Sequence, residues 1–221
     1  MKHIVKILES YFITHDVKYF KVQRPKGYKY IPGQATELAI NKPGWEDQKR
    51  IFTFTDLPTK RHLEFMIKIY RDHKGVTNEL GKTNTGKELI IGEPFGAIHY
   101  KGPGIFLAAG SGITPFIAIF RDLHKKKQLK GNRLIYSNKT IDDIILGQEL
   151  LSMLKTNFTN VITRQNTIGF VGERIDRRFL IGQIADFNQH FYVCGPESFV
   201  KSITHDLLEL GVTPNSLVVE E

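Results

Sequence analysis

The chain has 221 residues, of which 41% are hydrophobic and 24% are charged, a composition typical of a soluble globular protein. Its net charge of +8 favours acidic partners or nucleotide phosphates. The one cationic run, Lys125-Lys126-Lys127, has no nucleic-acid-binding module around it, so we expect no nucleic-acid partner. No apolar run reaches transmembrane length, and the charged N-terminus does not resemble a signal peptide. A single cysteine, Cys194, excludes an internal disulfide and a cysteine-ligated iron–sulfur cluster within the chain, and a reducing cytoplasm is the expected location.

Residues 1 to about 100 are rich in short strand-like runs separated by turns. The clearest runs are 4–8, 17–22, 35–40, 51–55 and 63–70. Pro32 and Gly33 suit the two central positions of a type II turn, and a helix is expected only near Val76 to Leu80. Strands at this spacing predict a small antiparallel β-barrel.

From Gly102 onward, apolar strand runs alternate with helical ones. Strands are expected at 105–109, 133–137, 160–163, 191–194 and 216–220, and helices at 115–124, 147–155 and 197–210. Such alternation predicts a parallel sheet covered by helices. We therefore expect two domains, residues 1–101 and residues 102–221, and an irregular stretch around 165–190.

The segment from Ile105 to Phe120 reads as a buried strand, a tight glycine turn at Gly110 and Gly112, and a helix. In this geometry backbone N–H groups and a helix N-terminus face an anion. Thr114 is suited to cap the helix, and Pro115 stands where the plain dinucleotide fingerprint has a third glycine. On these residues alone, a tight connection without a ligand is the alternative.

The order of the motifs resembles that of the ferredoxin–NADP(+) reductase superfamily over nearly the whole chain. That resemblance rests on six segments in the family's order: Pro32-Gly33-Gln34, Arg50-Ile51-Phe52-Thr53, Gly75-Val76-Thr77, Gly110 to Pro115, Cys194-Gly195-Pro196 and the terminal Glu220 or Glu221. It implies a Greek-key flavin-binding barrel followed by an α/β domain that binds NAD(P).

By this resemblance, Arg50 binds the flavin pyrophosphate, for which a bidentate guanidinium is suited. An ion pair with Glu46 or Asp47 is the alternative for Arg50. Phe52 replaces the usual tyrosine and lies against the flavin ring, although a place in the barrel core competes with this role. The resemblance gives Thr53 a catalytic role, because its hydroxyl bonds the flavin nitrogen that receives hydride. Because side chains alternate along a strand, Thr53 is expected on the opposite face from Arg50 and Phe52. A local twist or bulge is therefore expected if all three residues are to reach one flavin.

Two further segments complete the flavin assignment. Backbone N–H groups at a helix start in Gly75-Val76-Thr77 suit a pyrophosphate and therefore favour FAD over FMN; a helix cap without a ligand is the alternative. Lys68-Ile69-Tyr70 corresponds to the strand beneath the ribityl and adenosine portions in the family.

On the nicotinamide side, the resemblance assigns cofactor contacts to Gly110, Gly112, Ile113, Thr114 and Pro115. Cys194, Gly195 and Pro196 follow a strand at the carboxyl edge of the sheet, where open α/β sheets bind ligands. In the family this thiol positions the nicotinamide and is counted as catalytic with Glu220; otherwise an isolated cysteine is a small buried apolar residue. The aromatic residue that many relatives carry at the C-terminus is missing here.

The second parallel strand ends in Ser137-Asn138-Lys139, without the acidic residue that would mark NAD. Lys139, Arg164 and Arg174 correspond to cations that bind the 2′-phosphate in NADPH-using relatives, although each also fits a solvated surface. We therefore expect NADPH, with NADH as the alternative.

Together these features predict an enzyme in which NAD(P)H passes hydride to bound FAD. Electrons then leave to a separate acidic carrier, flavodoxin or ferredoxin, attracted by the positive surface. The alternatives are a free-flavin or ferric-siderophore reductase, an electron-transfer subunit of a larger complex, and a nucleotide-binding regulator without redox turnover.

Overall fold

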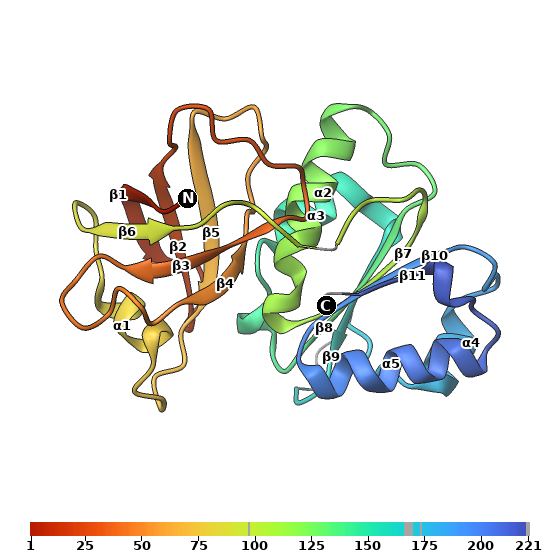
Figure 1. Ribbon diagram of the computed structural model, residues 1–221. Coiled ribbons are helices and arrows are strands. Elements are labelled where there is room, and N and C mark those ends of the chain that lie inside the picture. Colours follow the sequence, from red (N-terminus) through yellow and green to blue (C-terminus); the bar gives the residue numbers. More distant parts are fainter. Residues whose placement is uncertain (97, 166–169, 173, 220–221) are drawn as a thin grey trace. The chain divides into compact units, whose positions relative to one another are not determined.

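The computed structural model describes residues 1–96, 98–165, 170–172 and 174–219. The chain forms two compact units (Figure 1). The first, here called the barrel unit, comprises Met1–Gly96 together with Thr114–Asp122. The second, the sheet unit, comprises Ala97–Ile113 and Leu123–Glu221. The barrel unit therefore includes a helical segment that follows the glycine turn in the sequence.

Six antiparallel strands build the barrel unit, in the order β4-β3-β6-β1-β2-β5. Their bounds are β1 His3–Phe12, β2 Val17–Gln23, β3 Ala35–Ile40, β4 Arg50–Thr53, β5 His62–Lys68 and β6 Glu88–Ile91. The predicted barrel strands are confirmed, and β6 is an addition that the sequence prediction did not include. Beyond the end of β4, the Thr55 amide donates to the Glu64 carbonyl on β5 over 3.0 Å, which brings the two edge strands together.

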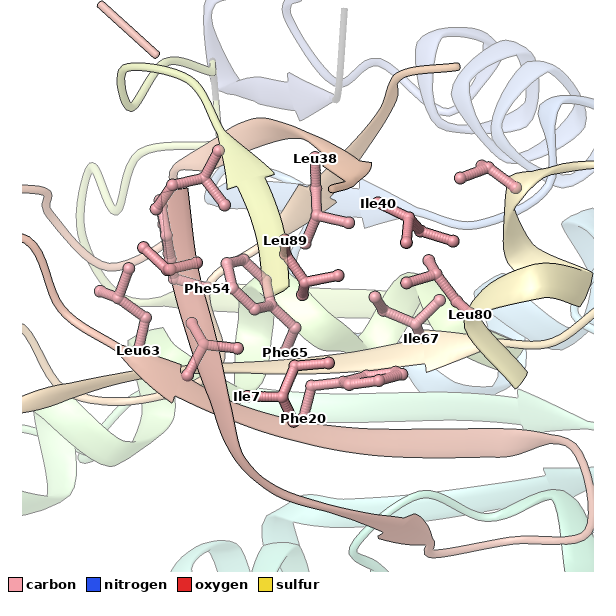
Figure 2. Close-up of a cluster of buried hydrophobic side chains, with 14 of the residues drawn as sticks. Ile7, Phe20, Leu38, Ile40, Phe54, Leu63, Phe65, Ile67, Leu80 and Leu89 are labelled. Atoms are coloured by element: carbon pink, nitrogen blue, oxygen red, sulfur yellow. The ribbon is translucent and has the colours of Figure 1, made fainter. Parts of the chain in front are cut away.

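Alternating apolar side chains from the strands fill the barrel. Figure 2 shows the labelled side chains of this cluster converging, Phe20, Phe54 and Phe65 among them, and all three are fully buried. The predicted turn is present: Gly33 has a φ of +93° and the Gln34 amide donates to the Ile31 carbonyl over 3.1 Å. A glycine at that position avoids the strain that a side chain would cause at positive φ.

Helix α1, Val76–Lys82, follows β5 and packs Val76 and Leu80 into the barrel core. Its C-terminal carbonyls are bonded by a buried cation: the Lys18 ammonium on β2 donates to the Gly81 carbonyl at 3.0 Å and to the Thr83 carbonyl at 2.9 Å. Burial lowers the pKa of Lys18. The cation complements the negative end of the helix dipole and fixes the helix on the barrel.

In the sheet unit, five parallel strands lie in the order β11-β10-β7-β8-β9. They are β7 Gly104–Ala109, β8 Arg133–Asn138, β9 Phe158–Ile162, β10 His190–Cys194 and β11 Leu217–Val219. The α-helices after β7 are α2 Thr114–Lys125, α3 Gly147–Leu154, α4 Arg177–Gln183 and α5 Glu197–Glu209. Short 3-10 helices are η1 Gly110–Ile113, η2 Ile141–Asp143, η3 Lys155–Asn157 and η4 Pro214–Ser216. The predicted combination of an antiparallel barrel and a parallel α/β sheet is confirmed.

Helices α4 and α5 pack against the sheet through Phe179, Leu180, Ile203 and Leu207, and the two helices lie side by side in Figure 1. The sequence prediction of an irregular stretch at 165–190 was wrong for α4. The carboxylate of Asp176 accepts from the Phe179 amide at 2.8 Å, so this short helix has an N-cap that the sequence already contains. Among the described residues, no helix is both long and apolar enough to cross a bilayer.

Candidate functional site

A cavity of about 400 Å³ opens in the barrel unit between β4, the loop after β5 and the start of α1. Most of its walls come from residues that the sequence singled out. Its lining residues are Arg50, Ile51, Phe52, Tyr70, His73, Gly75, Val76 and Thr77. Two motifs some twenty-five positions apart in the sequence thus meet around one cavity.

One arginine and several aromatic side chains line this cavity. Arg50 is exposed, donates to the Lys49 carbonyl at 2.7 Å, and forms no ion pair with Glu46 or Asp47. Its guanidinium therefore keeps donors for an oxyanion. Gly75 is the N-cap residue of α1 and makes no side-chain hydrogen bond, so the first amides of this helix have no partner within it.

His73 is the lining residue that sequence reasoning missed. Its ring meets the ring of Tyr70 edge-on, with the centroids 6.0 Å apart. Tyr70 keeps 47% of its surface exposed, so the pair offers an accessible aromatic wall. The signal in the sequence was only the position of His73, between the predicted strand and the Gly75 turn.

Lys68 and Ile69 do not line the cavity. The Lys68 ammonium lies 2.7 Å from the Asp16 carboxylate, and the Ile69 side chain is buried in the barrel core. Of this predicted segment, only Tyr70 reaches the cavity, because successive residues of an extended chain point to opposite faces.

Thr53 ends β4 and is also not part of the cavity wall. Strand β4 pairs with β3 in regular register from Arg50 to Thr53, so the bulge expected within this strand is not present. The hydroxyl oxygens of Thr53 and Thr114 lie 3.1 Å apart and both residues are buried. Two predicted site residues are therefore in contact. Thr114 is the first residue of α2, and it belongs to the barrel unit together with Pro115.

In the sheet unit, the glycine turn packs against the cysteine motif. A Cβ atom added to Gly112 would lie 2.4 Å from the Cys194 carbonyl oxygen, so only glycine fits there. Gly110 has a φ of +54°, and its carbonyl accepts from the Tyr136 hydroxyl at 2.9 Å. The Ile113 side chain is fully buried and serves the core.

The cysteine motif itself ends β10 and starts α5. Cys194 is 3% exposed, and Pro196 is the N-cap residue of α5. A Cβ at Gly195 would lie 3.0 Å from the Ala109 side chain, so this glycine lets β7 and β10 end close together. Both predicted motifs therefore meet at the carboxyl edge of the sheet, where ligands of open α/β folds bind.

A second cavity, of about 460 Å³, lies in the sheet unit near the ends of β8 and β9. One cation and several hydroxyls line it. Its walls are Ser137, Thr163, Arg174, Ile175, Asp176, Ser198, Phe199, Ser202 and Ile203. Arg174 was predicted from the sequence; the four hydroxyl residues were not, because serine and threonine carry no distinctive spacing.

The other two predicted cations lie outside this cavity wall. Lys139 and Arg164 are exposed, and the Arg164 amide donates to the Lys139 carbonyl at 2.9 Å, so the loops after β8 and β9 are adjacent. Glu220 and Glu221 lie outside the described residues.

Both units of this chain are similar to parts of known proteins. The family described as oxidoreductase NAD-binding domain matches residues 106–205. The reductase component of propane 2-monooxygenase from Rhodococcus jostii is 26% identical over 88% of this chain and 55% of its own length. NADH–cytochrome b5 reductase 1 from Arabidopsis thaliana is 26% identical over 95% of this chain and 80% of its own length.

A solved structure extends the likeness to the full fold. The ferredoxin NADP+ reductase from Neisseria gonorrhoeae, solved with bound FAD and NADP, superimposes with a TM-score of 0.87 at 20% identity, covering 99% of this chain and 97% of that one. Residues 106–205 thus match an oxidoreductase NAD-binding family, and the whole chain shares the fold of this ferredoxin NADP+ reductase. These likenesses agree with the resemblance that the sequence motifs showed.

Some of the relatives are longer than this chain. It spans 55% of the Rhodococcus reductase component and 49% of a flavohemoprotein from Deinococcus radiodurans, 27% identical to it. The flavin and nicotinamide nucleotide expected from the sequence agree with the FAD and NADP of the Neisseria structure.

Proposed function

We propose that this chain is an NAD(P)H-dependent flavoprotein reductase, in which residues 1–101 bind FAD and residues 102–221 bind the nicotinamide nucleotide. The observation that carries the proposal is the barrel cavity, where Arg50 and the start of α1 meet an aromatic wall. Bound FAD would supply hydride acceptance and the storage of two electrons. The protein supplies binding, orientation and electrostatics.

The donors of the barrel cavity fit a flavin dinucleotide. The Arg50 fork and the amides of Gly75, Val76 and Thr77 are suited to a pyrophosphate, because a guanidinium and backbone N–H groups both bond oxyanions. FMN has a single phosphate and no adenine, so it would leave part of these donors and the Tyr70–His73 wall unused. This supports FAD over FMN.

For the nucleotide, the cavity of the sheet unit favours NADPH. Arg174 and the hydroxyls of Ser137, Thr163, Ser198 and Ser202 line it, and this donor set suits a phosphate. The one carboxylate in its wall, Asp176, accepts from the Phe179 amide and caps α4. A ribose diol, which NADH would present, lacks the charge that Arg174 complements.

Two hydroxyls and one thiol are the side chains that we propose to act in the transfer step. We assign Thr53 to hold the reactive edge of the flavin, and Thr114 to lie beside it, on the evidence of their 3.1 Å contact. Cys194 and Gly195, against which Gly112 packs, position the nicotinamide. From the sequence alone, we also propose a catalytic role for Glu220.

The electron acceptor we propose is a separate acidic carrier protein, flavodoxin or ferredoxin. The net charge of +8 supports this, since a cationic surface accelerates encounter with an anionic partner. Cytochromes and oxygenase components are the other acceptor classes to test, because the relatives include a cytochrome b5 reductase and an oxygenase reductase component.

The proposal is tested by the absorption spectrum of the purified protein, followed under anaerobic conditions. We expect a flavin spectrum that bleaches within the first turnover on addition of NADPH, and more slowly with NADH. Acceptors are then compared at increasing salt: flavodoxin, ferredoxin, cytochrome b5 and free FMN. Steep inhibition of flavodoxin or ferredoxin reduction by salt supports the acidic carrier, whereas protein that binds neither FAD nor FMN refutes the whole assignment.

A further inference from the structure

Helix α2 is attached to the barrel at two points within the barrel unit. At its first residue, the Thr114 hydroxyl lies 3.1 Å from that of Thr53. Seven positions later, the Arg121 guanidinium lies 2.5 Å from the Glu64 carboxylate on β5. Seven residues are about two turns of α-helix, or about 10 Å along its axis. Two fixed points at this distance determine both the position and the direction of the helix.

The second point of attachment is a charged pair with little exposure to water. The Arg121 and Glu64 side chains are 19% and 11% exposed. Arg121 also donates to the Thr55 carbonyl at 2.7 Å, so its guanidinium bridges β5 and the segment after β4. A charge-assisted contact in such a site is stronger than a hydroxyl–hydroxyl bond.

The Glu64 carboxylate is held in place from its other sides. Its Oε1 atom accepts from the Thr55 hydroxyl at 2.9 Å, and its Oε2 atom accepts from the Tyr19 hydroxyl at 3.1 Å. Glu64 therefore presents a fixed anion to α2, because both of its oxygens also accept hydrogen bonds from the barrel. A freely rotating carboxylate would hold the helix less exactly.

We propose that Arg121 and Glu64 are a positioning pair for hydride transfer, which fixes α2 on the barrel so that Thr114 stays beside Thr53. This inference rests on the proposed function, in which Thr53 adjoins the flavin and Thr114 adjoins the nicotinamide. Neither Arg121 nor Glu64 lines the barrel cavity or the cavity of the sheet unit. Their effect is on alignment, and a displacement of about 1 Å between reacting groups costs roughly 100-fold in rate.

The experiment compares Arg121→Met, Glu64→Gln and the double variant with the unmodified protein. Flavin reduction by saturating NADPH is measured in single turnovers, with the Kd for FAD, the KM for NADPH and the isotope effect from deuterated NADPH. We expect each single variant to reduce flavin roughly 10- to 100-fold more slowly, with unchanged Kd and KM. The double variant should be no slower than the slower single variant, because the two side chains act as one unit.

Two matched variants keep the result specific. Lys21→Met removes another barrel ion pair, the 2.7 Å contact of Lys21 with Glu9, and should leave the reduction rate unchanged. Arg121→Lys restores a cation and should recover part of the rate. Glu64→Gln keeps the size of the side chain and one acceptor oxygen, so it remains informative if Arg121→Met does not fold.

The outcomes separate this inference from the proposed function. Flavin reduction at an unchanged rate in folded Arg121→Met or Glu64→Gln overturns the positioning role and leaves the reductase assignment intact. A slower rate that is matched by weaker FAD or NADPH binding also overturns it, because the pair would then be merely structural. Absence of flavin reduction by NADPH in the unmodified protein refutes the proposed function itself.

Discussion

The hydroxyl oxygens of Thr53 and Thr114 lie 3.1 Å apart, although the two residues are 61 positions apart in the sequence. One hydroxyl ends a barrel strand and the other begins α2, and both residues are buried. A buried hydroxyl without a partner costs about 1–3 kcal/mol, so each of these oxygens stabilises the other. Ligand binding would add a third partner to this pair.

Replacement of Thr53 by valine is expected to slow flavin reduction by NADPH roughly 10- to 100-fold. The reason is that the loss of a hydrogen bond to a group that becomes charged costs about 1.5–3 kcal/mol in the transition state. Valine keeps the size and the strand preference of threonine, so the barrel should fold. Thr53→Ser retains the hydroxyl and should keep most of the rate. Stopped-flow absorbance of the flavin measures both, and equal rates for the valine and serine variants would contradict the role of the hydroxyl.

Much of this site could be predicted from the sequence because its motifs depend on local backbone geometry. The turn at Gly110 and Gly112, the strand from Arg50 to Thr53 and the helix start at Gly75 each show a local signal. Positions that depend on packing between distant segments could not be predicted. The Arg121–Glu64 pair, the His73 ring and the hydroxyls of Ser198 and Ser202 carry no such signal, and Lys68 was assigned to the cofactor although it pairs with Asp16.

His73 should distinguish FAD from FMN. We expect His73→Ala to weaken FAD binding by roughly 5- to 100-fold, the range for loss of one base–aromatic stack, and to leave FMN binding unchanged. Quenching of flavin fluorescence on titration gives both Kd values. Tyr11→Ala, which removes an exposed aromatic ring outside the cavity wall, is the control and should change neither value. An equal loss for FAD and FMN would place the effect of His73 on the flavin ring or on folding.

Arg174 should determine nucleotide preference. We expect Arg174→Ala to lower kcat/KM for NADPH by roughly 10- to 100-fold, since a hydrogen bond to a charged group contributes about 1.5–3 kcal/mol. The value for NADH should hardly change. Arg164→Ala removes an exposed cation outside the cavity and should have a much smaller effect. If Arg164→Ala is the more damaging of the two with NADPH, the phosphate site lies in the loop after β9 and not in the cavity.

Asp56 should make stability depend on pH. Burial, and the nearby Glu64 carboxylate, raise the pKa of Asp56 from 3.8 to about 7, while its Oδ1 accepts from the Tyr30 hydroxyl at 2.6 Å. The folded state therefore holds this proton more tightly than the unfolded state. The stability that the neutral carboxyl contributes is complete below about pH 4 and is lost as pH rises toward 7.

Asp56→Asn removes this titration and keeps an oxygen for Tyr30. We expect the unfolding free energy of the unmodified protein, relative to Asp56→Asn, to fall by about 2 kcal/mol between pH 5 and pH 8. Urea unfolding at both pH values measures the difference. A constant difference between the two proteins would show that Asp56 does not titrate in this range.

Gly112 should tolerate no side chain without strain, because a Cβ there would lie 2.4 Å from the Cys194 carbonyl oxygen, a backbone atom that cannot rotate aside as a flexible side chain could. We expect Gly112→Ala to destabilise the protein by about 1–3 kcal/mol, the usual cost of overpacking, and to weaken NADPH binding, since the glycine turn and the cysteine motif would separate. Gly182→Ala in α4 is the matched control: nothing lies within 4 Å of its Cβ, and alanine favours a helix. Thermal unfolding and NADPH titration measure the two effects. Loss of stability with unchanged NADPH affinity would mean that this contact serves the fold alone. Loss of both stability and NADPH affinity would show that nucleotide binding depends on the contact between the glycine turn and the cysteine motif.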